Sequence, residues 1–190
     1  MPWPTCEEGF NLRKLTLFAS QVVSDFKNIP LPPGGGPRKV VELTEDSTEI
    51  LLDSLDLASW RHCLIYFLGV NGGYAWSKTY LNGDLNEDHY RFQLLMANGT
   101  NVYAFDDEAL GIKTIGPPPG PWYPQWICQL LFSGGRARMW ICGDNNDPWD
   151  PWLGQGVLTY TEEVDNITSI TFSTGDPDNP YKAGTRVEVW

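Results

Sequence analysis

The turn signals of this sequence limit its fold more than any other feature. Glycine-containing turn signals lie at residues 71–73, 98–99 and 133–135, and each is flanked by two runs rich in β-branched and aromatic residues. Asn-Gly and Gly-Gly favour hairpins because they adopt the backbone conformation that reverses the chain between two twisted strands. We therefore predict three hairpins, which join residues 63–69 with 74–80, 90–96 with 101–105, and 126–132 with 136–142.

Other runs extend the β pattern along most of the chain. Strands are predicted at 39–43, 157–160, 167–172 and 185–190, and residues 50–57 fit either a strand or a short helix. The composition agrees, since 19 Gly and 15 Pro supply turns while 9 Trp, 8 Tyr and 8 Phe favour strands. The expected fold is mainly β, an antiparallel β-sandwich of about ten strands.

The N-terminal part has a different period. Between residues 11 and 28, apolar side chains recur at steps of three and four, which predicts an amphipathic helix. Its apolar stripe consists of Leu12, Leu15, Phe18, Ala19, Val22, Val23 and Phe26. At about 1.5 Å per residue this helix is about 27 Å long, close to the roughly 30 Å thickness of the hydrocarbon core of a membrane.

A segment rich in proline and glycine follows the helix. Residues 29–37 contain the run Pro32, Pro33, Gly34, Gly35 and Gly36, which neither continues a helix nor fixes a chain direction. We interpret this segment as a hinge. The chain of 190 residues is then one domain, with a helical segment at 1–28, the hinge at 29–37 and a β-sandwich body at 38–190.

The charge and hydropathy of the chain exclude some classes of partner and location. The net charge of −11 argues against binding to nucleic acid phosphates. No apolar run approaches the roughly 18 residues of a constitutive membrane span. The first residues lack the pattern of a secretory signal, so we expect cytoplasmic synthesis or non-classical release, with association with a target membrane when the protein is active.

Two loops concentrate aromatic residues. The proline-rich run at 116–126 contains Trp122, Tyr123 and Trp126, and the acidic run at 144–152 contains Trp149 and Trp152. Because prolines keep the first run out of a regular strand, at least one of the Trp122 and Tyr123 rings is expected at the surface. Exposed Trp and Tyr rings suit a lipid headgroup region or the apolar face of a sugar. These five residues are the predicted binding site for lipid headgroup or glycan.

Few patterns point to catalysis or to a metal. The chain contains only two histidines, His62 and His89, and its four cysteines show no CxxC spacing. The acidic run at 144–152 departs from the calcium-binding loop pattern, because Pro148 takes a ligand position. We therefore expect no enzyme activity, no cofactor and no metal. Cys128 and Cys142 would face each other in the third predicted hairpin, so they are either buried thiols or one disulfide.

Taken in order, these features resemble two related groups of proteins. An Arg-Lys-Val-Val run at 38–41 opens the body, a Trp-Tyr-Pro-Gln-Trp run lies at 122–126, and Gly-Asp-Asn at 143–145 precedes Leu-Gly-Gln-Gly at 153–156. This order resembles that of the actinoporin-like pore-forming cytolysins and of the fungal fruit-body lectins that share their β-sandwich. The chain departs from the family where the tyrosine-bearing helix that follows the aromatic hairpin is expected, and its acidity favours a neutral headgroup or a glycan.

The resemblance implies one function and leaves one alternative. The implied cytolysin docks on phosphocholine-type headgroups through Trp122, Tyr123 and Trp126, releases its N-terminal helix at the hinge and forms a pore as a homo-oligomer. Several copies are required because a single helix exposes polar side chains that lipid cannot accommodate. The alternative is a soluble lectin in which the same aromatic loop stacks on a sugar and Asn or Asp side chains bind its hydroxyls.

Overall fold

The computed structural model describes residues 36–68, 77–98, 101–107, 125–144 and 152–190. The chain divides into two compact units, Met1–Pro30 and Leu31–Trp190. All described residues belong to the second unit and cover most of the predicted body. The predicted helix at 11–28 lies outside the described residues, and so does the predicted hinge apart from Gly36 and Pro37.

The described part is built mainly from β-strands. Two short helices, α2 (Leu57–Trp60) and the 3-10 turn η1 (Glu87–His89), lie between them. The strands are β1 (Lys39–Glu42), β2 (Glu49–Leu52), β3 (His62–Leu68), β4 (Lys78–Leu81), β5 (Tyr90–Asn98), β6 (Asn101–Asp107), β7 (Gln125–Ser133), β8 (Arg136–Asp144), β9 (Trp152–Tyr160), β10 (Ile170–Ser173) and β11 (Arg186–Val189).

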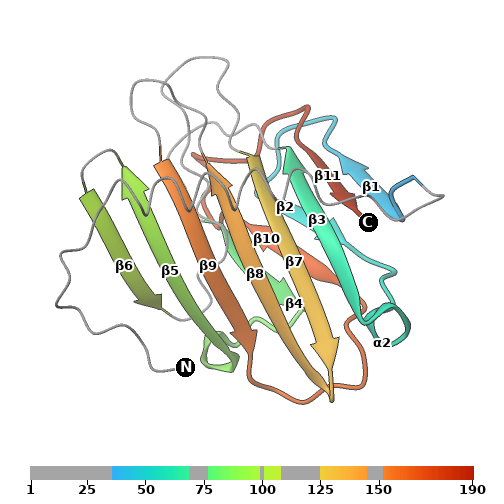
Figure 1. Cartoon of the computed structure of the whole chain (residues 1–190). Coiled ribbons are helices and arrows are strands. Elements are labelled where there is room, and N and C mark those ends of the chain that lie inside the picture. Colours follow the sequence, from blue (N-terminus) through green and yellow to red (C-terminus); the bar gives the residue numbers. More distant parts are fainter. Residues whose placement is uncertain (1–35, 69–76, 99–100, 108–124, 145–151) are drawn as a thin grey trace, which may run out of the picture. The chain divides into compact units, whose positions relative to one another are not determined.

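These strands form two antiparallel sheets. The larger has eight strands in the order β1-β11-β3-β7-β8-β9-β5-β6, and the smaller has three in the order β2-β10-β4. Figure 1 shows the small sheet lying behind the middle of the large one. The predicted fold class is therefore confirmed as mainly β with two antiparallel sheets.

The hydrophobic core lies between the facing sides of the two sheets, because alternate residues of each strand point inward. In β2, for example, Ile50 and Leu52 are buried while Leu51 between them is 51 % exposed. Phe67 of β3 joins the two layers. Its ring packs edge-on against Phe172 of β10 with centroids 5.7 Å apart, and it also contacts the ring of Tyr181 at 5.5 Å.

Two of the three predicted hairpins are confirmed. Strands β5 and β6 pair from Asn98 and Asn101 outward, and strands β7 and β8 pair from Ser133 and Arg136 outward. Gly134 and Gly135 close the second hairpin with φ angles of +60° and +76°. Positive φ at both central positions is the requirement of a type I′ turn, which explains why two glycines occur there.

The prediction that residues 63–69 and 74–80 form a hairpin is wrong. Strand β3 belongs to the large sheet, where it pairs with β7 and β11, whereas β4 belongs to the small sheet and pairs with β10. Both edges of β3 are thus occupied by strands distant in sequence. A local turn signal such as the Asn-Gly-Gly run at 71–73 does not specify which strands become partners.

The register also settles the arrangement of the described cysteines. Cys128 lies opposite Ile141, and Cys142 lies opposite Ile127, so the two cysteines are offset by one residue and are not cross-strand partners. Cys63, Cys128 and Cys142 are buried thiols. Burial raises the pKa of the Cys63 thiol to about 12, which makes this group unreactive at neutral pH.

Candidate functional site

The structure describes only part of the aromatic set that the sequence singles out. Trp122, Tyr123 and Trp149 lie outside the described residues, and so do the predicted helix-stripe residues and the hinge residues before Gly36. Trp152 is the first residue of β9, but its side chain is not among those described. The predicted aromatic site can therefore be located for Trp126 alone.

Trp126 belongs to the core. It lies on the inner face of β7 opposite Phe67 of β3, and its side chain is only 3 % exposed. The β9 backbone leaves room for the indole at Gly154, where an added Cβ would lie 3.0 Å from the ring. Strand β7 begins at Gln125, directly after the last of these prolines, so Trp126 is a strand residue. The expected exposure of Trp122 or Tyr123 concerns residues outside the described ranges and stays a prediction.

A shallow groove lies instead on the outer face of the large sheet. It has a volume of about 500 Å³ and crosses strands β5, β6, β8 and β9. Its lining consists of Gln93, Leu94, Leu95, Ala104, Trp140, Gln155, Gly156 and Val157. A volume of this order is within the usual range for small-molecule sites, in which apolar walls surround a few polar groups.

The sheet register explains why these side chains meet. Trp140 of β8 lies opposite Val157 of β9, which in turn lies opposite Gln93 of β5. In the next row of the same face, Gln155 lies opposite Leu95 of β5 and Leu95 opposite Ala104 of β6. An indole ring and two amide side chains therefore share one stretch of the sheet surface.

The groove is open and uncharged. Leu95 is 39 % exposed, Gln93, Ala104 and Gln155 are also exposed, and Trp140 and Val157 are half-buried. No lining residue carries a charge. The chain as a whole has a net charge of −11, so an uncharged patch of this kind is a departure from its general surface. Such a surface suits an uncharged molecule that has both an apolar face and hydrogen-bonding groups.

The sequence contains a signal for this groove that the prediction of strands and loops did not use. In residues 136–142 the small and apolar residues Ala137, Met139 and Ile141 alternate with Arg136, Arg138 and Trp140. Since Arg136 and Arg138 mark the solvent side of the strand, Trp140 belongs to that side too. The same alternation in β5 places Gln93 and Leu95 with Arg91 on the outer face.

Within the described ranges no group of three or more His, Cys, Asp or Glu side chains could hold a metal ion. No helix among the residues that the structure describes is both long enough and apolar enough to span a bilayer. A further polar cluster, around His89, lies where strand β5 begins and strand β9 ends.

Comparison with known proteins gives no further guide to the site. No protein-family model, no curated protein and no solved structure matches this chain.

Proposed function

We propose that this protein is a carbohydrate-binding protein that holds a neutral sugar in the groove formed by Trp140, Gln93 and Gln155. The observation that carries the proposal is the presence of an accessible indole ring and two amide side chains on one uncharged stretch of the sheet. A pyranose ring has an apolar face that packs on an aromatic ring. Its hydroxyls both donate and accept hydrogen bonds, and so do the amide groups of glutamine.

A neutral sugar fits the groove better than a charged ligand does. A quaternary ammonium group is held by several aromatic rings or by an aromatic ring with a carboxylate, and the lining contains one aromatic ring and no carboxylate. A phosphate or a sialic acid would require a cation, and no lining residue supplies one. This proposal keeps the lectin alternative of the sequence analysis but moves its site from the loop at 116–126 to the sheet.

A glycan array followed by calorimetric titration tests the proposal. The intact chain should bind neutral glycans, and Trp140→Ala should weaken binding at least tenfold because the stacking surface is lost. Gln93→Ala and Gln155→Ala should each weaken it about ten- to hundredfold, which corresponds to the roughly 1–3 kcal/mol of a lost hydrogen bond. Thr159→Ala is the matched control, since Thr159 lies on β9 outside the groove lining.

The pattern of effects decides between the groove and other sites. Normal binding by Thr159→Ala together with loss in the three groove variants supports the groove. If Trp140→Ala binds as tightly as the unchanged chain while Trp122→Ala does not, the sugar site is the aromatic loop and the groove proposal fails. Absence of binding to any neutral glycan also rules it out.

A second function, permeabilisation of membranes, is favoured by the apolar stripe at 12–26 and the Pro-Gly segment after it. Helices of this kind insert as oligomers whose polar faces line water. Vesicles of phosphatidylcholine and sphingomyelin should then leak an enclosed dye. Deletion of residues 1–30, or the pair Trp122→Ala and Tyr123→Ala, should abolish leakage, whereas Trp140→Ala should leave it unchanged. Intact vesicles across several lipid mixtures would exclude this function.

A further inference from the structure

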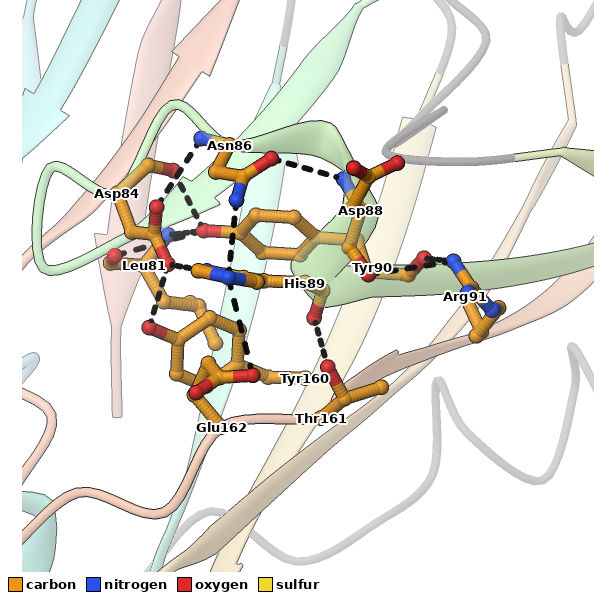
Figure 2. A network of polar contacts seen from close by, with 10 residues as sticks. All are labelled: Leu81, Asp84, Asn86, Asp88, His89, Tyr90, Arg91, Tyr160, Thr161 and Glu162. Carbon is orange, nitrogen blue, oxygen red and sulfur yellow. Dashed lines mark hydrogen bonds and ion pairs between the residues drawn. The ribbon is translucent and has the colours of Figure 1, made fainter.

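A network of polar contacts surrounds His89 at the junction of the two sheets. Figure 2 shows the imidazole between Asp84, Asn86 and Glu162. The Nδ1 atom of His89 lies 2.7 Å from Oδ2 of Asp84, which also accepts a hydrogen bond of 2.8 Å from the hydroxyl of Tyr160. Asp84 and His89 lie on the connection from β4 to β5, and Tyr160 is the last residue of β9.

The backbone around this network is held firmly. The buried hydroxyl of Tyr90 accepts from the backbone N–H of Leu81 at 3.0 Å and donates to the carbonyl of Asp84 at 2.7 Å. The backbone N–H and the hydroxyl of Thr161 both donate to the carbonyl of His89, at 2.8 and 3.0 Å. The position of the imidazole is therefore fixed by its backbone and by the hydrogen bond at Nδ1. Nε2 is the ring atom whose partner can change.

The two groups near Nε2 suit different charge states of the ring. The side-chain nitrogen of Asn86 lies 2.9 Å from Nε2, and an amide nitrogen only donates, so Nε2 accepts and the ring is neutral. The oxygen of the same amide is occupied, because it accepts from the backbone N–H of Asp88 at 3.2 Å. The carboxylate of Glu162 lies 3.8 Å from Nε2, where it can pair with the ring only when Nε2 carries a proton.

We propose that His89 is a pH-operated clasp between the β4–β5 connection and the segment after β9. Protonation of Nε2 turns this atom into a donor, so it repels the amide nitrogen of Asn86 and gains the carboxylate of Glu162. The ring then bridges Asp84 on one segment and Glu162 on the other. The clasp closes as the pH falls, and this inference does not depend on the sugar groove.

The charges around the ring favour the closed form. Hydrogen bonding to Asp84 raises the pKa of His89 above its ordinary value, partial burial opposes this, and the charges of Asp84, Glu162 and Asp88 raise it further. Among the cations of this region, the guanidinium of Arg91 donates to the carbonyls of Asp88 and Tyr90, and Lys78 pairs with Glu87. Tyr90 and Tyr160 are neutral in neutral and mildly acidic solution because burial raises their pKa.

The raised pKa of His89 determines how the stability of the fold changes with pH. A histidine whose folded-state pKa exceeds its unfolded value stabilises the fold fully below the unfolded pKa, near 6.5. That contribution is lost as the pH rises through the folded pKa. The junction between the sheets should therefore be tighter in mildly acidic solution than at pH 8.

NMR titration of the intact chain tests the clasp. His89 is one of two histidines, so its ring signals are assigned with His62→Gln. The pKa of His89 should be higher in the folded chain than in the urea-unfolded chain. It should fall in Glu162→Gln and stay unchanged in Glu163→Gln, a matched control whose carboxylate pairs with Arg136. Both glutamates are exposed, so both variants should fold.

Hydrogen exchange measures whether closure of the clasp holds the two segments together more tightly. After correction for intrinsic rates, protection of the Thr161 amide should increase from pH 8 to pH 5.5, by up to about tenfold for each unit by which the pKa of His89 is raised. Glu162→Gln should reduce this increase and Glu163→Gln should not. Three results would each overturn the clasp: a folded pKa at or below the unfolded one, a pKa unmoved by Glu162→Gln, or protection that does not change with pH.

Discussion

Phe67→Ala is expected to lower the free energy of unfolding by about 3–5 kcal/mol, the usual cost of removing a buried phenylalanine side chain. Phe67 is 1 % exposed and touches residues outside its own sheet, namely Phe172 of β10 and Tyr181. Its removal leaves a cavity between the two layers that neither β3 nor β10 can close, because each is held by strands on both sides. Urea denaturation followed by circular dichroism measures the change.

The neighbouring residue provides the control for this prediction. Leu68 is 41 % exposed and points away from the core, so Leu68→Ala should cost no more than about 0.5–1 kcal/mol. If Phe67→Ala costs as little as Leu68→Ala, the two sheets do not share the core described above.

Gly156→Val is expected to destabilise the fold by about 3 kcal/mol and to disturb the groove at the same time. A Cβ at this position would lie 2.9 Å from the backbone oxygen of Gln93 and 3.0 Å from the ring of Phe92. The oxygen belongs to the paired strand β5 and cannot move without shifting the β5–β9 ladder. That shift would also displace Gln155 and Val157, which flank Gly156 in the groove.

Substitutions at two other glycines show whether the loss of stability is specific to Gly156. Gly36→Ala should be close to neutral, since nothing lies within 4 Å of the added Cβ. Gly154→Ala should cost less than Gly156→Ala, because its nearest contact is the edge of the Trp126 ring rather than backbone. Thermal unfolding gives the order, and an equal cost at all three positions would contradict the packing described for β9.

Local signals in the sequence were sufficient for most strands and for two hairpins. The β7–β8 turn is an example, because Gly134 and Gly135 have the positive φ angles that the turn signal implies. The pairing of β3 could not be predicted in this way. Its partners β7 and β11 are chosen by burial of apolar side chains from distant parts of the chain, and an Asn-Gly-Gly run carries no information about them.

The candidate site was harder to predict than the fold. Trp126 and Trp140 belong to neighbouring strands and are both aromatic, yet one faces the core and the other the solvent. Composition does not distinguish them, and only the alternation along each strand does. Gln93 and Gln155 come from strands that are sequentially distant, so their approach to Trp140 depends on the register of β8, β9 and β5 and follows from no local motif.

Sugar binding on the outer face of the large sheet is tested most directly by NMR of the intact chain during titration with a neutral glycan selected on an array. We expect the indole signal of Trp140 and the side-chain amide signals of Gln93 and Gln155 to shift together with one dissociation constant, while the signal of the buried Trp126 stays in place. Shifts confined to residues outside the groove, with Trp140 unmoved at saturation, would contradict it.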